Sequence, residues 1–225
     1  MQDPSLLPDK ESVAASDPSR ACTPEDVPEA SPRRESPAAA LFDFLEILVF
    51  AVCITLLIFT LFFRVCRVDG GSMKNTLQNG ELLIASNLSE IENGDIVIFH
   101  QTSEKYDRFN EALVKRVIAS EGQTVRIEYA TGSVYVDGQL LDEPYAALLD
   151  RNDREIGVWT QAPSVDGFDM NTGVFEVTVP DGCYFVMGDN RNNSADSRAV
   201  QVGFVDARRI LGKAVVRINP WTVYN

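Results

Sequence analysis

The segment from Gly70 to Leu77, GGSMKNTL, places a serine among small and flexible residues. Gly70 and Gly71 have no side chains to shield the backbone, so a second chain could approach Ser72 closely. A serine displayed in this way is either a nucleophile or part of an ordinary turn that leads into a strand. Because a nucleophilic serine needs a base to take its proton, the choice depends on finding that base.

Histidine and lysine are the candidate bases. The one histidine, His100, ends the segment GDIVIFH and has no acidic residue at a recognisable catalytic spacing, so an edge-strand histidine is the better interpretation than a Ser-His-Asp arrangement. Lys115 lies in the apolar run ALVKRVI, where burial would lower its pKa toward neutrality and let the amine accept a proton. Lys74 is close to Ser72 in sequence, but it sits in a polar loop where nothing would lower its pKa.

Lys115 is predicted to lie on a strand. Because side chains alternate along a strand, Lys115 would share one face with Leu113 and Val117, and Arg116 would point to the other face. Taken alone, an exposed strand lysine is the commoner case, so the assignment of a base needs support from a third signal.

That third signal is the polar segment Gly188–Arg198, GDNRNNSADSR, which follows the apolar run CYFVM. Small polar residues with interspersed opposite charges can form a dense hydrogen-bonded loop. Taken alone, the segment is also compatible with a turn held by an Asp196–Arg198 ion pair. It lacks the alternating acidic residues and closing glutamate of an EF-hand, so we exclude calcium.

Metal and disulfide chemistry find no support in the cysteines. No pair suggests a disulfide, and no CxxC or Cys/His spacing suggests zinc. We expect no metal and no cofactor, and we expect free thiols at Cys22, Cys53, Cys66 and Cys183.

Charge is unevenly distributed along the 225 residues. The chain has 20 basic and 33 acidic residues, a net charge of −13, which argues against nucleic acid as a partner. Residues 1–40 contain eight acidic residues, four basic residues, seven of the eleven prolines and no aromatic residue. Such a composition cannot bury enough apolar surface to offset chain entropy, so residues 1–40 are predicted to be a disordered acidic tail.

An apolar segment follows the tail. Residues 41–63 are long enough to cross a hydrocarbon core of about 30 Å as a helix, and residues 47–63 contain no charge. A buried core helix is the competing interpretation, but a helix that is apolar on all faces would need a larger protein around it. The flanking basic residues are balanced, so the positive-inside rule leaves the orientation open.

Beyond residue 63 the pattern changes to short β-like runs separated by turn residues. Residues 64–225 are therefore predicted to form a mostly β domain whose strands curl or close to hide their edges, with a polar, irregular insertion at 141–172. The predicted strands are 81–85, 96–100, 113–119, 124–129, 133–136, 174–179, 183–187 and 210–218.

The ordered set GGSM-NTL, VKRVI and MGDNRNNSADSR, behind an apolar helix, resembles the bacterial type I signal peptidase family. The resemblance covers roughly residues 42–218. It implies a curled β-sheet catalytic domain behind one transmembrane helix, with Ser72 as nucleophile, Lys115 as general base and Ser194 as the residue that orients the lysine amine. Further positions that it implies are the supporting residues Asp196, Arg198, Arg116 and Asp189, and the substrate-pocket residues Gly70, Met73, Leu113 and Val114.

The resemblance also implies a substrate and a location. We expect a single-pass enzyme of the bacterial cell membrane, with an extracytoplasmic catalytic domain that acts as a monomer on precursor proteins bearing Ala-x-Ala signal peptides. Phe63 and Ser72 are nine residues apart, so the serine lies at most about 30 Å from the end of the span. The alternatives are a self-cleaving Ser-Lys protease of related fold, which the helix and the acidic charge disfavour, and a membrane-anchored β module that binds a partner without catalysis.

Two positions depart from the family pattern. Asn75 stands where proline is common, although asparagine also suits a turn. Gly70 stands where some members carry a serine whose hydroxyl donates to the oxyanion. The Ser72 N–H is then the oxyanion donor that this loop provides. Loss of a second donor would remove roughly 3 kcal/mol of transition-state stabilisation if nothing replaced it.

Overall fold

The computed structural model describes residues 37–101, 111–150, 152–218 and 222–224. Most of the predicted acidic tail (residues 1–36) and Cys22 lie outside the described residues. The boundary between the two compact units of the chain falls between Leu48 and Val49, inside a helix, so the helix and the β-rich unit are each described on their own.

Helix α1 (Pro37–Phe62) has 26 residues and is long and apolar enough to cross a membrane. It begins four residues before the predicted start, because Pro37 suits a first helical position and the alanines after it favour a helix. It also ends one residue earlier than predicted, because Phe63 already pairs with Ser86 in a sheet.

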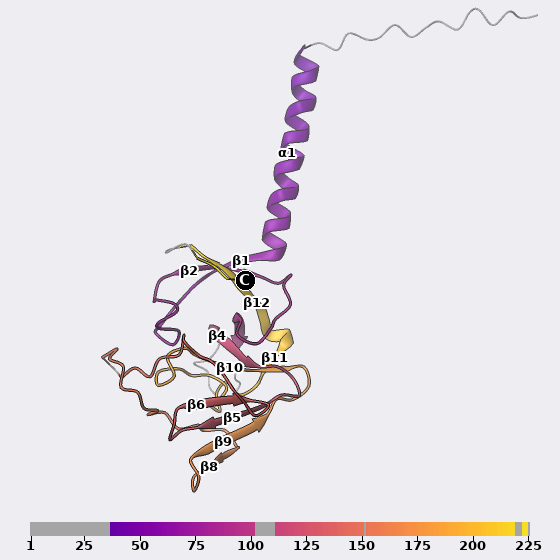
Figure 1. The fold of residues 1–225 in the computed structure, drawn as a ribbon. Helices are drawn as coiled ribbons and strands as arrows, with labels where there is room; N and C mark the ends of the chain where they lie inside the picture. Colours follow the sequence, from indigo (N-terminus) through magenta and orange to yellow (C-terminus); the bar gives the residue numbers. More distant parts are fainter. Residues whose placement is uncertain (1–36, 102–110, 151, 219–221, 225) are drawn as a thin grey trace, which may run out of the picture. The chain divides into compact units, whose positions relative to one another are not determined.

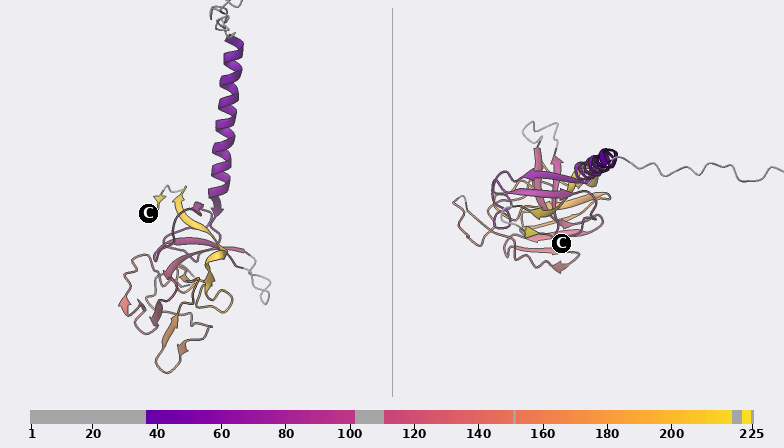
Figure 2. Two further views of the ribbon diagram at one scale, coloured as in Figure 1. Left: turned by 90° about the vertical axis from the view of Figure 1, so that its right-hand side faces the viewer. Right: turned by 90° about the horizontal axis from the view of Figure 1, so that it is seen from above.

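The β-rich unit contains two antiparallel sheets (Figures 1 and 2). The larger has the strand order β1-β2-β12-β3-β4-β10-β11, with β13 on β12, and the smaller has the order β7-β6-β5-β9-β8. Figure 1 shows β5, β6, β8 and β9 gathered at one end of this unit and β1, β2 and β12 at the other. The mostly β class is therefore confirmed.

The larger sheet comprises β1 (Phe63–Arg67), β2 (Leu82–Ser86), β3 (Ile96–Gln101), β4 (Glu111–Ala119), β10 (Cys183–Met187), β11 (Val205–Asp206), β12 (Ile210–Arg217) and β13 (Thr222–Val223). The smaller sheet comprises β5 (Thr124–Glu128), β6 (Ser133–Val136), β7 (Gln139–Leu140), β8 (Phe168–Asp169) and β9 (Val174–Thr178). A short 3₁₀ helix, η1 (Ala207–Arg209), precedes β12.

Every strand predicted from the sequence is present, with ends within two residues of the prediction. The turn at Asp137-Gly138, between β6 and β7, has positive φ at both residues, +51° and +78°, as a type I′ hairpin requires. The strands that the sequence missed are β1, which follows the helix without a break, and the two-residue strands β7, β8, β11 and β13. A strand of two residues is too short to show an alternating apolar pattern in the sequence.

The predicted insertion at 141–172 is irregular apart from β8, but it packs against the rest of the unit. Ala147 and Leu149 are buried, and isolated bridges join Ala147 to Asn190 and Leu149 to Glu155. The bridge from Ala147 to Asn190 ties the segment to the polar loop at 188–198, and the bridge from Leu149 to Glu155 lies within the segment.

Three apolar clusters form the core. One packs the smaller sheet against β4 and β10, through residues such as Ile127 and Phe185. A second joins β2, β3 and β12 and includes Met73 and Leu77 from the serine loop. The third includes Val97 of β3. The core therefore reaches both the serine loop and the strand that carries Lys115.

The backbone around Gly212 of β12 leaves no space for a side chain. A Cβ there would lie 2.7 Å from the Ser86 carbonyl oxygen, and backbone atoms of a paired strand cannot move aside cheaply. We expect Gly212→Ala to lower the free energy of unfolding by about 1–3 kcal/mol, measured by chemical denaturation of the detergent-solubilised chain.

Gly71→Ala is the matched control for this prediction. Its Cβ would meet the flexible Lys74 side chain, at 3.2 Å, so its effect on the unfolding free energy should be smaller. Equal stability of the Gly212→Ala variant and the unchanged chain would contradict the expected backbone clash.

Candidate functional site

Ser72 lies in the loop that joins β1 to β2. Met73 and Leu77 are almost completely buried and anchor this loop in the core, and the Leu77 N–H donates to the Met73 carbonyl at 2.8 Å. Gly70 has a φ of +87°, in the left-handed region that favours glycine, and its N–H donates to Asn79 Oδ1 at 2.9 Å. The loop is thus fixed on both sides of the serine.

Lys115 lies on β4, and its side chain reaches Ser72. Its Nζ donates to Ser72 Oγ and to the Val114 carbonyl, both at 2.8 Å, and the residue is 2% exposed. Burial lowers the pKa of Lys115 to about 8, although the negative charges of Asp196 and Asp189 act in the opposite direction. An appreciable fraction of this amine is therefore neutral near neutral pH.

The alternation predicted along β4 is present. Val117 belongs to one apolar cluster and Leu113 packs against it, whereas Val114 belongs to another. Arg116, which points away from the face of Lys115, holds Asp189 with two hydrogen bonds of 2.9 and 2.7 Å.

Asp189 begins the network of the polar loop. It is fully buried and accepts from Thr76 Oγ1 as well as from Arg116. The Arg116 guanidinium carbon lies 3.9 Å from the centre of the Tyr145 ring, a cation–π contact. The network connects the serine loop, β4, the polar loop and the 141–172 segment.

Asp196 and Arg198 form a second buried ion pair, at 2.7 Å. The Gly188 N–H also donates to Asp196 Oδ2, at 3.0 Å. Burial raises the pKa of Asp196, but the charge and hydrogen bonds of Arg198 outweigh it and hold the pKa below its usual value. Asp196 therefore stays ionised.

Ser194 lies on the same loop and is buried, with a 4% exposed fraction. Its Oγ makes no hydrogen bond of ordinary geometry within the part of the chain that the structure describes, but it lies close enough to the Asp196 carboxylate to help lower the pKa of that group. The bond to the Lys115 amine that the family resemblance implies is not formed here, and that role for Ser194 stays a prediction.

Gly188 and Asn190 join the polar loop to the serine loop, and sequence reasoning assigned neither a role. A Cβ on Gly188 would lie 2.3 Å from Ser194 Oγ and 2.5 Å from the Ser72 carbonyl oxygen, so glycine is required. The Asn190 N–H donates to that carbonyl at 2.9 Å, and its Nδ2 donates to the Gly71 carbonyl at 3.0 Å. In the sequence, the glycine directly after the predicted strand 183–187 was the signal that another segment approaches the backbone closely there.

The 141–172 segment contributes another group that was missed. Glu143 accepts two hydrogen bonds from Arg191, at 2.8 and 2.5 Å, and the Arg191 side chain is 1% exposed. The Arg191 Nε donates to the Gly188 carbonyl at 3.1 Å. Glu143 thus neutralises the charge of Arg191, whose hydrogen bond to the Gly188 carbonyl fixes the polar loop where it contacts Ser72.

A cavity of about 280 Å³ opens beside Ser72 and Lys115. It is lined by residues of the 68–73 loop and of 111–115. All four residues predicted for the substrate pocket line it, namely Gly70, Met73, Leu113 and Val114.

Other reactive side chains lie elsewhere. His100 is on β3 with an exposed side chain. The thiols of Cys53, Cys66 and Cys183 are free. In residues 37–101, 111–150, 152–218 and 222–224, no group of three or more His, Cys, Asp or Glu side chains could hold a metal ion.

Comparison with known proteins places the chain in a family. The sequence model of the family described as "Signal peptidase, peptidase S26" matches residues 41–221. "Probable signal peptidase I-2" of Synechocystis sp. is 35% identical over 200 residues, 86% of this chain and 81% of that protein. "Signal peptidase I S" of Bacillus subtilis is 36% identical over 187 residues, 81% of this chain and 91% of that protein.

A solved structure of a signal peptidase I from Enterococcus faecalis is 28% identical to this chain. The match covers 56% of this chain and 98% of the solved one, with a TM-score of 0.37.

Glu143 gives a test of the network that holds the polar loop. Glu143→Ala leaves the buried Arg191 guanidinium without its carboxylate, so we expect the free energy of unfolding to fall by about 3–5 kcal/mol. The measurement is chemical denaturation of the Glu143→Ala chain, with Arg191→Met and the double variant completing a cycle. If the two single effects simply added in the double variant, the two side chains would not be coupled as described.

Proposed function

The chain belongs to the signal peptidase family, peptidase S26, whose members are membrane serine endopeptidases that remove signal peptides from precursor proteins, and we propose that Ser72 and Lys115 carry out this cleavage. The observation that supports the proposal most directly is the 2.8 Å contact between Lys115 Nζ and Ser72 Oγ. Burial of that lysine lowers its pKa to about 8, so the amine can serve as a base.

The proposed reaction is acyl transfer to water. The neutral Lys115 amine takes the Ser72 hydroxyl proton while Oγ attacks the carbonyl carbon of the last residue of the signal peptide. As the tetrahedral intermediate collapses, the Lys115 ammonium gives its proton to the leaving amine. The same amine then activates a water molecule, which releases the signal peptide from the serine ester.

The oxyanion of the intermediate is assigned to the Ser72 N–H. No acceptor among the described residues takes this N–H, which leaves it available to the substrate. Gly70 has no hydroxyl to add a second hydrogen bond.

The supporting residues act on the position of the dyad. Arg116 and Asp189 fix β4 to the polar loop, and Asp196 and Arg198 fix the loop itself. We assign Ser194 to orienting the Lys115 amine, because its buried Oγ makes no hydrogen bond of ordinary geometry among the described residues and it stands on this loop.

We assign the substrate to the free side of β4. On that side the pairing with β10 ends at Met187 and Arg116, so the backbone of residues 111–115 faces the cavity without a strand partner in the described chain. An extended peptide can add there as a strand. The small volume of this cavity, about 280 Å³, favours the small side chains of an Ala-x-Ala sequence.

Helix α1 anchors the enzyme in the membrane. We propose that the anchor is single-pass in the bacterial cell membrane and that residues 64–225 face the extracytoplasmic side, where signal-peptide cleavage sites emerge. Anchoring enzyme and substrate in one bilayer raises their effective concentration without a new contact. We further propose that the enzyme acts as a monomer.

The dyad is tested by substitution. We expect Ser72→Ala, Lys115→Met and Lys115→Arg each to lower kcat by about 10³-fold or more, because a methionine has no base and a guanidinium stays protonated. Cleavage of a precursor protein in detergent is followed by mass spectrometry, which also locates the cut. Lys74→Met is the matched control, since Lys74 pairs with Asp153 at 2.5 Å and has no contact with Ser72 Oγ; its cleavage rate should be retained.

The pH dependence follows from the lowered pKa of Lys115. The active form is the neutral amine, so kcat/KM should rise about tenfold per pH unit below about pH 8 and level off above it. Initial rates on one precursor from about pH 6 to pH 10 measure this profile. A flat profile across that range would exclude a lysine base while leaving the family assignment intact.

A further inference from the structure

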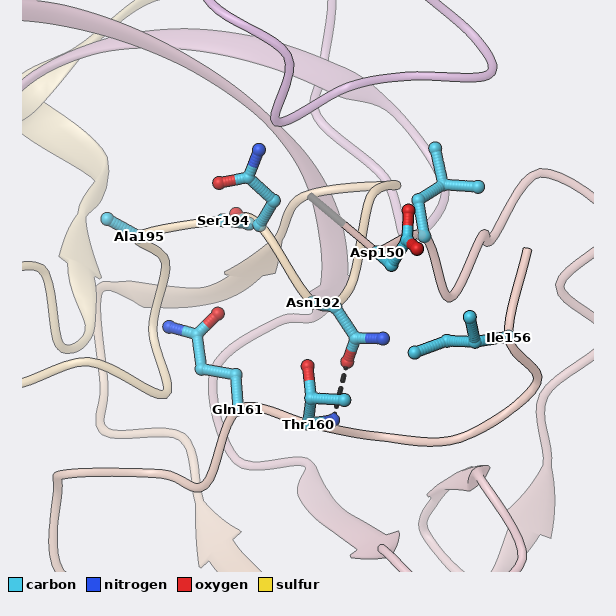
Figure 3. Close-up of a pocket in the computed structure, with 9 residues that line it drawn as sticks. Asp150, Ile156, Thr160, Gln161, Asn192, Ser194 and Ala195 are labelled. Atoms are coloured by element: carbon cyan, nitrogen blue, oxygen red, sulfur yellow. Dashed lines mark hydrogen bonds between the residues drawn. The ribbon is translucent and has the colours of Figure 1, made fainter. Parts of the chain in front are cut away.

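A second and larger cavity, of about 840 Å³, adjoins the polar loop (Figure 3). One wall comes from Asn192–Ala195 of that loop, and the opposite wall comes from the irregular segment at 149–161. Figure 3 shows Asp150, Ile156 and Thr160 across the opening from Ser194.

The two walls are held together by Asn192. The Thr160 N–H donates to Asn192 Oδ1 at 2.8 Å, and Asn192 Nδ2 donates to the Val158 carbonyl at 2.8 Å. The bridge between Leu149 and Glu155 braces the far wall. The cavity is therefore a fixed feature of the fold and not a gap between loose loops.

This cavity reaches the dyad through Ser194. A Cβ on Gly188 would touch both Ser194 Oγ and the Ser72 carbonyl oxygen, so these two atoms are neighbours. Ser194 is buried, lines the cavity, and has an Oγ that makes no hydrogen bond of ordinary geometry among the described residues. Ser194 thus lines the larger cavity and also lies next to the backbone of Ser72, which lines the smaller one.

Resting on the proposed function, we propose that the larger cavity binds the first residues of the mature protein, which follow the scissile bond. A peptide whose signal-peptide side fills the 280 Å³ cavity has to continue past Ser72. Ser194, which lies next to the Ser72 carbonyl across Gly188, lines the cavity proposed to receive it. A volume of about 840 Å³ lies in the range of cavities that enclose a whole small ligand, enough for several residues.

The chemistry of the lining fits a polar peptide of variable sequence. Amide and hydroxyl groups predominate, with Leu149 and Ile156 as apolar members. Asp150 is the one charged residue in the lining, and Arg154 neutralises it with hydrogen bonds of 2.8 and 2.5 Å. A single neutralised carboxylate is a poor site for a cation, and a lining without a basic residue is a poor site for an anion.

The two cavities then account for a difference in sequence selectivity between the two sides of the scissile bond. The smaller one restricts the side chains before the bond by volume. The larger one offers many weak polar contacts after the bond, so it adds binding without selecting one sequence.

The test compares two peptides with the same residues before the scissile bond and either one residue or about five residues after it. With the full chain in detergent, we expect kcat/KM for the longer peptide to exceed that for the shorter one about tenfold or more, the equivalent of a few weak contacts. Thr160→Trp fills the cavity from an exposed position and should reduce this ratio to about one.

Val158→Trp is the matched control. Val158 is 56% exposed on the same segment and is not part of the lining, so the ratio should stay at the value of the unchanged chain. Ile156→Trp, also in the lining, serves as a second filling variant if Thr160→Trp fails to fold in a thermal unfolding measurement.

The outcomes separate this inference from the proposed function. Cleavage of both peptides with equal kcat/KM by the unchanged chain, or a ratio that survives both filling variants, would overturn the cavity assignment and leave the peptidase assignment standing. Cleavage of neither peptide, nor of a full precursor, would overturn the proposed function and this inference together.

Discussion

The site depends on removing one lysine amine from water. Burial lowers the pKa of Lys115 from 10.5 to about 8, and a shift of that size corresponds to roughly 3 kcal/mol. Because the folded state holds the proton less tightly than the unfolded chain, this cost is fully present below about pH 8 and disappears as the pH approaches 10.5. The chain thus gives up some stability at neutral pH to keep a base beside Ser72, and the packing of β4 between β3 and β10 supplies the compensation.

The carboxylates near the Lys115 amine are arranged so that they do not form an ion pair with it. Asp189 and Asp196 both raise the pKa of Lys115, and a direct ion pair with either would restore an ordinary ammonium. Each carboxylate is instead paired with an arginine, Arg116 or Arg198. The arginines neutralise the anions locally, and the same pairs fix the polar loop against β4. The same two ion pairs therefore neutralise the carboxylates and position the polar loop.

Residue type and order were enough to predict the strands and to nominate Ser72 and Lys115, because a lysine inside an apolar run and a serine after glycines are local signals. Their roles as nucleophile and base were inferred from the ordered set of motifs and the family resemblance that it carries. The contacts that complete the site are not local. Glu143 meets Arg191 across 48 residues from a segment whose polar composition indicated only an irregular insertion. Gly188 is required by atoms of Ser72 and Ser194; its place after a strand indicates a close approach, but the pattern of its own segment cannot show that Ser72 is the residue that approaches. The predicted start of helix α1 was four residues too late, because the proline and alanines of its first turn are not part of the strongly apolar run from which the helix was predicted.

The strand order carries a consequence for the time at which the protein can act. Strands β2 and β3 are not paired with each other; β12, the last long strand of the chain, lies between them and pairs with both. The serine loop precedes β2, and the lysine strand β4 pairs with β3, so the two halves of the dyad belong to hairpins that β12 joins within the sheet. Contacts between distant parts of a chain form late in folding. The nucleophile should accordingly remain inactive during synthesis until β12 has emerged and paired with β2 and β3.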